Sequence, residues 1–332
     1  SVGMNDIQDS PVRMRHLLYL LVAAMVCFSS DAEIMAKTHF LIPAGPGGGW
    51  DGTARGVGEA LVKSNLVLNV TFENLSGGGG GRAIAKLIET ADRQQNTLLI
   101  NSTPMVVRSL QKIFPQSFRD LEPIASVIAD YSCFVVTRDS PIKNFSDAIK
   151  QFKQDPRSLK AAGGSVRGST DHFILARAIE LAGENPRKLI YVPYDGGGKA
   201  LAGILTGETQ ILSTGLSEAL DMARAGEVNI IAVTASERIP EAIDIPTLSE
   251  QGFDLVFANW RGFFAAPGLP ASQYRLMKQT IAALVLTPEF EQVRQRNGWA
   301  LLHNEGDAFY RFLEQQELEI ATLMRKLGFL RS

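Results

Sequence analysis

Four glycine clusters hold the residues of this chain that are best suited to binding chemistry. They lie at residues 43–51 (PAGPGGGWD), 77–81, 163–168 (GGSVRG) and 196–198, each between a short apolar run and a helical pattern. Glycine lets the backbone approach a ligand closely, and the helix N-terminus behind it favours anions. The pattern predicts a cleft that holds a small anion largely with backbone atoms. Any one cluster could equally be a tight strand-to-helix turn.

Known catalytic motifs do not fit the polar residues in these clusters. The first cluster lacks the Gly-Lys-Ser/Thr of a phosphate-binding loop, and Trp50 replaces the third glycine of a dinucleotide fingerprint. Around Ser165, Arg167 stands where a nucleophile elbow needs glycine. Asp171 directly precedes His172 and is poorly placed to orient that imidazole in a triad. The sequence therefore offers binding loops without recognisable catalytic machinery.

Structural roles compete with binding roles for the same side chains. Asp51 and Asp171 suit the first turns of the helices in which they are expected. Ser169 or Thr170 can cap the second of these helices, and His172 can be a satisfied packing residue. Both interpretations stay open for each residue.

Short apolar runs alternate with helical patterns along the chain. The runs that predict strands are residues 40–42, 66–72, 97–101, 124–128, 133–137, 189–192, 211–213, 230–234 and 255–257. The predicted helices are 53–63, 83–89, 146–154, 170–181, 199–205, 216–225, 272–286 and 307–327. Such alternation favours an α/β protein with parallel sheets. Interruptions near 138–144 and 252–261 suggest domain boundaries that make the first domain discontinuous.

The N-terminal region reads as an export signal. Arg13 and Arg15 precede an apolar run at residues 17–28, and small residues follow. This order is typical of a secretory signal peptide with cleavage after Ala32 or Ala36. The run is short for a membrane span, which needs about 20 residues, although an uncleaved anchor is the alternative. Residues 1–36 are therefore assigned to an N-terminal extension and signal peptide.

Bulk composition narrows the class of protein further. The 332 residues suggest two domains, and a net charge of −2 gives no electrostatic case for nucleic acid. Of the two cysteines, Cys27 lies in the signal run, so the mature chain keeps Cys133 alone and forms no internal disulfide. With one cysteine and scattered histidines a zinc site is not expected, and no cofactor is indicated.

Several fragments, in order along the chain, resemble the solute-binding receptors of tripartite tricarboxylate transporters. The likeness extends from about residue 38 to the end and is strongest to the citrate-type branch of these TctC- and Bug-like periplasmic binding proteins. The matching fragments are PAGPGGGWDGTAR (43–55), FENLSGGGGGRA (72–83), GGSVRGSTDH (163–172), YVPYDGGGKALAGILTGE (191–208), AVTASERI (232–239), PTLSEQG (246–252) and NWRGFFAAPG (259–268).

The resemblance implies a two-lobed α/β periplasmic binding protein, of the Venus flytrap type, with a ligand cleft between the lobes. Lobe 1 would comprise residues 37–137 and 258–332, and lobe 2 residues 138–257. Such a receptor closes on citrate or another di- or tricarboxylate and delivers it to a large and a small membrane subunit. It would be an exported, monomeric periplasmic protein that needs no cofactor and catalyses no reaction.

The same resemblance implies a set of ligand-binding residues drawn from both lobes. They are Pro46, Gly47, Gly48, Gly49, Trp50, Asp51, Asn101, Ser102, Thr103, Ser165, Arg167, Gly168, Ser169, Thr170, His172, Tyr194 and Asp195. Arg167 stands where the family more often has a small residue, so it either clamps a carboxylate or points to solvent. Arg261, near the expected hinge, is interpreted as a structural ion-pair partner.

Two other functions remain as hypotheses. A secreted α/β hydrolase would use Ser165 and His172 on an ester, and would turn its substrate over. A ligand sensor would pass the binding signal to a signalling partner instead of a transporter.

Overall fold

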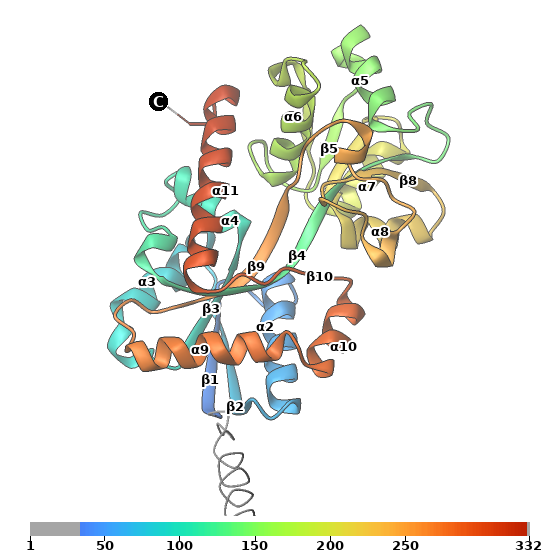
Figure 1. Cartoon of the computed structure of the whole chain (residues 1–332). Coiled ribbons are helices and arrows are strands. Elements are labelled where there is room, and N and C mark those ends of the chain that lie inside the picture. Colours follow the sequence, from blue (N-terminus) through green and yellow to red (C-terminus); the bar gives the residue numbers. More distant parts are fainter. Residues whose placement is uncertain (1–33, 331–332) are drawn as a thin grey trace, which may run out of the picture. The chain divides into compact units, whose positions relative to one another are not determined.

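The computed structural model describes residues 34–330, in which helices pack around two connected β-sheets (Figure 1). Residues 1–33 of the predicted signal segment, with Cys27, lie outside the described residues. The first strand, β1 (Met35–Ile42), contains Ala36. Cleavage after Ala32 would therefore leave β1 whole, whereas cleavage after Ala36 would remove its first two residues. Among the described residues no helix is both long enough and apolar enough to cross a membrane.

The first sheet has parallel strands on one side and antiparallel strands on the other. β1 pairs in parallel with β2 (Val67–Asn74) and β3 (Thr97–Ser102). β9 (Ala258–Ala265) then lies antiparallel between β3 and β4 (Glu122–Thr137), and the short β10 (Ala300–Leu301) also pairs with β4. β9 therefore joins β3 to β4, two strands that are not paired with each other directly.

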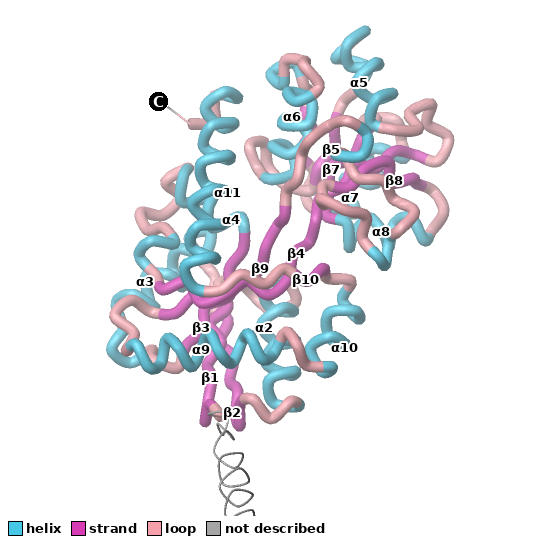
Figure 2. The backbone as a smooth tube through the Cα atoms, viewed as in Figure 1, coloured by secondary structure: helices cyan, strands magenta, loops and turns pink. Residues whose placement is uncertain are grey.

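The second sheet is built on the far end of the same long strand. Residues 132–137 of β4 pair antiparallel with β7 (Ile211–Gly215) and β8 (Val228–Val233). β5 (Ala161–Gly163) pairs in parallel with both β6 (Tyr191–Pro193) and β7. Figure 2 shows β4 running as one strand from the first sheet into the second.

Helices cover the faces of both sheets. The helices that follow strands of the first sheet, or close the chain beside it, are α2 (Gly49–Lys63), α3 (Gly81–Glu89), α4 (Thr103–Leu110), α9 (Ala271–Leu284), α10 (Pro288–Asn297) and α11 (Gly306–Leu327). Those between residues 138 and 257 are α5 (Phe145–Gln154), α6 (Thr170–Leu181), α7 (Gly197–Leu205) and α8 (Leu216–Arg224). In Figure 1 the upper end of α11 extends to the level of α6.

One apolar cluster runs through both sheets. It includes Leu99 of the first sheet and Ile231 of the second, together with the α11 residue Phe309. At its centre Trp260 is fully buried, and its indole N–H donates to Gln316 Oε1 of α11 at 2.7 Å. A buried indole N–H that lacked this acceptor would carry a desolvation cost. The last helix is thereby tied to the strand that lies between β3 and β4.

Most predicted elements are confirmed, but several are corrected, and strands β9 and β10 were not predicted. The two predicted strands at 124–128 and 133–137 are one strand, β4, and the predicted strand at 255–257 is extended coil that precedes β9. Helices α4 and α10 were not predicted, although proline in the first turn of each is compatible with a helix start. The expectation of parallel sheets holds only for the pairs among β1–β3 and β5–β7, since every pairing of β4 and β9 is antiparallel.

Candidate functional site

All four glycine clusters lie where a strand gives way to a helix, as the sequence predicts. They join β1 to α2, β2 to α3, β5 to α6 and β6 to α7. Glycine is required at Gly47 and Gly80, whose φ values of +94° and +102° strain other residues. Two of these junctions, those before α2 and α6, carry most of the predicted site residues.

In the first junction, the carboxylate of Asp51 fixes the loop by accepting hydrogen bonds. Its Oδ2 accepts the N–H of Gly47 at 3.0 Å, and its Oδ1 accepts bonds from Arg55 Nε and Asn74 Nδ2, both at 2.9 Å. Burial would raise the pKa of Asp51, but the bonds from Asn74, Gly47 and Arg55 outweigh it and lower that pKa. An ionised carboxylate with this many donors keeps its charge. Asp51 thus orders the loop and leaves Pro46 and Gly47–Gly49 exposed.

Trp50 links the same loop to the start of α4. Its indole N–H donates to Ser102 Oγ at 2.8 Å, and the guanidinium of Arg108 lies 5.8 Å from its ring centroid. Asn101, Ser102 and Thr103 are all at most 3% exposed. Their side chains are used within the protein, since Asn101 Oδ1 accepts the N–H of Ser102 and Thr103 Oγ1 reaches Ala258 O. A ligand role for these three residues remains a prediction.

The second junction is a compact network around Asp171. Ser165 Oγ donates to Asp171 Oδ2 at 2.7 Å and lies 2.6 Å from Ser169 Oγ. The hydroxyl of Tyr191 donates to Ser165 O at 2.7 Å. Burial, the largest influence, raises the pKa of Asp171 to about 6, and the carboxylate of Glu218 adds to this effect.

His172 serves the same loop as an acceptor. Its Nδ1 accepts the N–H of Gly168 at 3.0 Å, and its ring stacks on Tyr191 with centroids 4.5 Å apart. Burial and, secondly, the charge of Arg167 lower the pKa of His172 to about 4. The ring is therefore neutral near pH 7, with its proton on Nε2. No hydrogen bond joins His172 to Ser165 in the described structure, so the pair lacks the contact that a hydrolase needs to activate a serine.

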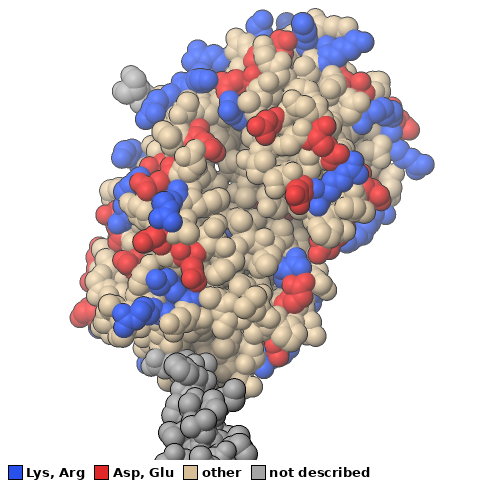
Figure 3. Space-filling model, viewed as in Figure 1, with Lys and Arg blue, Asp and Glu red and all other residues tan. Residues whose placement is uncertain are grey.

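A pocket of about 400 Å³ lies between the second junction and α4. Ser165, Gly168, Ser169 and Thr170 of the predicted set line it, together with Asp171. Figure 3 shows this protein with charged groups toward the rim of the viewed face and mainly uncharged residues across its centre. A volume of this size suits a small organic molecule.

The other predicted residues do not line this pocket. Arg167 is exposed and, with His172, borders a separate pocket of about 280 Å³ beside Arg187 and Phe329. The side chain of Asp195 is 98% exposed and lies 3.7 Å from Lys199 Nζ. Tyr194 packs its hydroxyl toward Gly203 of α7. The loop from Pro46 to Asp51 also lies outside the pocket's lining, which leaves its ligand contacts as predictions.

Sequence reasoning missed five polar residues that line the pocket: Arg108, Gln111, Asp130, Ser132 and Asn259. Arg108 donates to Gly79 O at 2.9 Å and has no carboxylate within 4.0 Å among residues 34–330. Asn259 Oδ1 is buried, and no described residue gives it a hydrogen bond. Arg108 resembles any surface arginine of a helix in sequence, whereas Asn259 belongs to the matched fragment NWRGFFAAPG and could have been proposed from it.

Arg261 is not the ion-pair partner that was expected. Its guanidinium donates to Thr53 Oγ1 at 3.1 Å, lies 6.0 Å from the ring of Trp299 and approaches Gly49 so closely that a Cβ there would be 2.7 Å from it. In the described part of the chain no carboxylate lies within 4.0 Å of it, and burial lowers its pKa while the more distant Asp130 opposes this.

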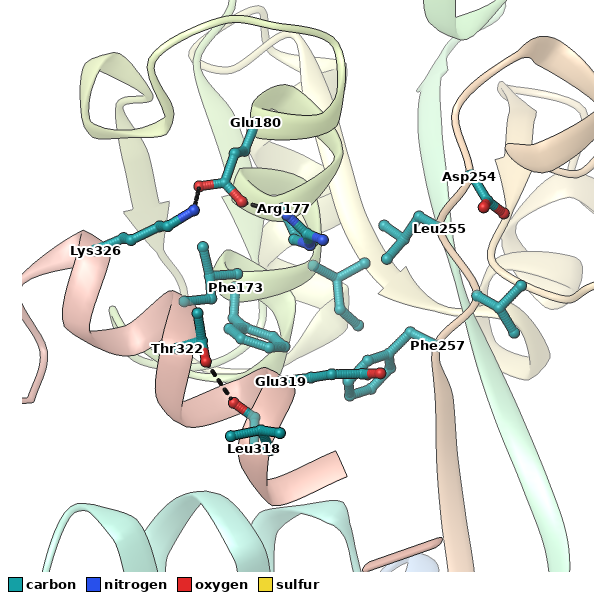
Figure 4. Close-up of a pocket in the computed structure, with 13 residues that line it drawn as sticks. Phe173, Arg177, Glu180, Asp254, Leu255, Phe257, Leu318, Glu319, Thr322 and Lys326 are labelled. Atoms are coloured by element: carbon teal, nitrogen blue, oxygen red, sulfur yellow. Dashed lines mark hydrogen bonds and ion pairs between the residues drawn. The ribbon is translucent and has the colours of Figure 1, made fainter. Parts of the chain in front are cut away.

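A second, larger pocket of about 490 Å³ lies between α6 and α11 (Figure 4). Phe173, Phe257 and Leu318 contribute its apolar surface. Its two cationic groups are already paired, since Glu180 contacts Arg177 and lies 3.1 Å from Lys326 Nζ, and its other charged groups are the carboxylates of Asp254 and Glu319. It contains none of the predicted loops, so the 400 Å³ pocket is the better candidate for the ligand site. Among the described residues no cluster of histidine, cysteine and carboxylate side chains is arranged to hold a metal ion.

Comparison with known proteins identifies the family. The profile described as "Tripartite tricarboxylate transporter family receptor" matches residues 53–329. The chain belongs to the tripartite tricarboxylate transporter receptor family. Members of this family are periplasmic solute-binding receptors and not enzymes, and this receptor has their two-lobed α/β fold.

Curated relatives and solved structures agree with this assignment. The receptor is 27% identical over 295 residues to a protein from the tcbD–tcbE intergenic region of Pseudomonas sp. (strain P51), covering 86% of this chain and 85% of that one. It is 28% identical over 247 residues to protein BugT of Bordetella pertussis (strain Tohama I), covering 72% and 73%.

Three solved structures share the fold of the receptor. A TctC solute-binding protein from Polaromonas, without ligand, superposes with a TM-score of 0.77 at 22% identity, covering 90% of this chain and 100% of that one. MatC from Rhodopseudomonas palustris, with bound malate, has a TM-score of 0.67 at 19% identity, covering 86% and 98%. An R. palustris protein with adipate has a TM-score of 0.69 at 21% identity, covering 88% and 97%.

Proposed function

We propose that this protein is a periplasmic receptor that captures a small organic carboxylate by hinge closure and catalyses no reaction. It then delivers the ligand to the large and small membrane subunits of a tripartite tricarboxylate transporter. Citrate and other di- or tricarboxylates are the first candidates, and the receptor acts as a monomer exported by a cleaved signal peptide. Malate and adipate, bound by two proteins of the same fold, extend the list of candidates.

The observation that carries this proposal is the composition of the 400 Å³ pocket. On one side lies Arg108, a guanidinium without a carboxylate partner within 4.0 Å among residues 34–330. On the other side lies the N-terminus of α6, at Thr170. A guanidinium binds a carboxylate through charge-assisted hydrogen bonds, and a helix N-terminus favours the same charge. The two walls come from different parts of the chain, since α4 follows β3 of the first sheet and α6 follows β5 of the second.

Hinge closure is supported by the way in which the two sheets are joined. β4 belongs to both sheets, and β9 pairs with it up to Tyr131, just before the pairing passes to β7 at Ser132. We assign residues 37–137 and 258–332 to one lobe and 138–257 to the other. A ligand that contacts both lobes only in the closed state shifts the population toward closure. In that state the exposed residues 46–49 would meet the loop that contains Ser165.

The test is a thermal-shift and calorimetric screen of the purified receptor against citrate, tricarballylate, malate, succinate, adipate and glutamate. A ligand that binds only the folded state raises stability by about 2.7 kcal/mol at a hundredfold excess over Kd. We expect a clear shift with one or two of these acids, which are recovered chemically unchanged. The absence of a shift with every acid would overturn the proposed ligand class, and turnover of a bound acid would overturn the receptor role.

A further inference from the structure

Asp171, Ser165 and Ser169 form a hydrogen-bonded chain on the α6 side of the ligand pocket. Ser165 Oγ lies 2.7 Å from Asp171 Oδ2 and 2.6 Å from Ser169 Oγ, and all three residues line the pocket. A hydroxyl group has one proton to donate and two lone pairs with which to accept. The protonation state of Asp171 therefore decides the direction of both hydrogen bonds.

When Asp171 is ionised, the hydrogen-bonded chain has no proton to donate to an anion. An ionised carboxylate only accepts, so Ser165 gives its proton to Asp171 and Ser169 gives its proton to Ser165. Both hydroxyl protons are then used inside the chain. The outermost group, Ser169 Oγ, can offer only a lone pair to a ligand in the pocket. A ligand carboxylate would meet this lone pair and the charge of Asp171 at the same wall.

With Asp171 protonated, the direction of the chain reverses. The carboxylic acid donates to Ser165, Ser165 donates to Ser169, and the proton of Ser169 becomes free to reach an anion in the pocket. We propose that Asp171 is a positioning residue that sets this direction, so that the receptor takes up its carboxylate ligand together with one proton from water. The inference rests on the proposed function, because it presumes that the ligand is an anion.

The charged and titratable groups around Asp171 act in both directions, and its carboxylate neighbours favour proton uptake. They are Glu218 of α8, Tyr191 of β6, Asp130 and Cys133 of β4, Arg108 across the pocket on α4, and Arg167 and His172 on its own loop and helix. Burial, followed by the charge of Glu218, already raises the pKa of Asp171 to about 6 in the free receptor. A second anion placed in the pocket raises it further. Arg108 opposes this effect and offers the ligand a counter-charge.

The proposal predicts a specific link between affinity and pH. Between the pKa of Asp171 in the free receptor and its higher value in the complex, affinity should fall up to about tenfold for each pH unit gained. Malate and adipate are suitable probes, because ordinary carboxyl groups titrate near pH 4 and contribute little above neutral pH. Isothermal titration near pH 7 in two buffers of different ionisation enthalpy counts the protons taken up on binding.

Asp171→Asn is the decisive variant. Its amide N–H₂ can donate to Ser165 as the protonated acid does, so the variant should bind either probe with no proton uptake and little pH dependence above neutral. Near pH 8 it should bind more tightly than the natural protein. Ser165→Ala interrupts the chain between Asp171 and Ser169 but leaves the carboxylate of Asp171 in the pocket wall, so it should reduce the pH dependence without abolishing it, at lower affinity. Circular dichroism and thermal unfolding establish that each variant is folded.

The outcomes separate the two proposals. Proton uptake by the natural protein that is absent in Asp171→Asn and smaller in Ser165→Ala supports the role of Asp171. Binding of a probe with no proton uptake, or with the same uptake in all three proteins, overturns that role and leaves the receptor function standing. Failure of the natural protein to bind any of the screened acids at any pH overturns the proposed function itself.

Discussion

At the scale of single residues, Arg108 is the strongest candidate for an electrostatic ligand contact. Arg108→Ala should weaken carboxylate binding by about 1.5–3 kcal/mol, the range for hydrogen bonds to charged groups, which is roughly 10- to 150-fold in Kd. Titration calorimetry measures this loss. Thermal unfolding should be measured in parallel, because the variant also loses the bond from Arg108 to Gly79 O.

Arg167→Ala is the matched comparison for this test. Arg167 is exposed and borders the separate 280 Å³ pocket, so its removal should change affinity less than removal of Arg108. A larger loss in Arg167→Ala would restore Arg167 as the carboxylate clamp and remove Arg108 from that role.

As the pH changes, the adjacent residues Asp171 and His172 should change the free energy of unfolding in opposite directions. The pKa of Asp171 is raised from 3.8 to about 6, so its contribution to stability falls as pH rises through that window. The pKa of His172 is lowered from 6.5 to about 4, so its contribution is lost as pH falls through the overlapping window. In the natural protein the two effects partly cancel between about pH 4 and pH 6.

In Asp171→Asn, the pH dependence of stability that His172 causes should no longer be partly cancelled. The variant should lose more stability than the natural protein when acidified from about pH 6.5 to pH 4, as measured by denaturant unfolding at each pH. Asp195→Asn makes the same chemical change at a side chain that is 98% exposed, and should behave like the natural protein. Parallel stability curves for all three proteins would contradict the pKa shifts of this loop.

At the scale of elements, β9 depends on Gly262 for its close approach to β4. A Cβ at this position would lie 2.6 Å from Ala125 O and 2.9 Å from Ser126 Cα, both backbone atoms that cannot rotate away. Gly262→Ala should therefore destabilise the protein by about 1–3 kcal/mol, the usual cost of overpacking. Chemical denaturation measures the change.

Gly52→Ala is the control, because it adds the same methyl group where nothing lies within 4 Å. Gly52 is exposed within α2, where alanine is the better helix former by about 0.8–1.0 kcal/mol. We expect a small gain in stability there. Similar effects of both substitutions would mean that β9 can move away from β4 without cost.

Local sequence signals predicted the elements whose pattern is complete within one segment. The glycine junctions and helix α6, predicted at 170–181 and found at Thr170–Leu181, belong to this class. β9 was missed because Asn259 and Arg261 break the apolar run, and its strand character comes from pairing with β3 and β4 far away in sequence.

The candidate site could be predicted only in part for the same reason. The loop before α6 can be recognised in the sequence by its glycines and hydroxyl groups. Four of its predicted residues line the pocket. The opposite wall is set by how α4 packs, so the role of Arg108 appears only when the chain is folded. Tyr194 and Asp195 follow a similar strand-to-helix pattern, yet their strand lies at the edge of the second sheet, away from the pocket.

At the scale of the whole described unit, the two sheets should unfold together. One apolar cluster contains residues of both sheets and of α11, and β4 is common to the two. Opening one lobe alone would expose part of this cluster to water. We expect differential scanning calorimetry to show one cooperative transition whose calorimetric and van't Hoff enthalpies agree. Two separated transitions would show that the shared cluster does not couple the lobes.

The position of β9 also has a consequence for how the chain acquires its structure. The first sheet needs β9 between β3 and β4, although about 120 residues separate β4 from β9 along the chain. A chain that emerges N-terminus first therefore cannot connect β3 to β4 within this sheet until residue 265 is available. Such high contact order predicts slow folding. A nascent chain that stays unfolded for this long is a suitable substrate for export by threading through a membrane channel.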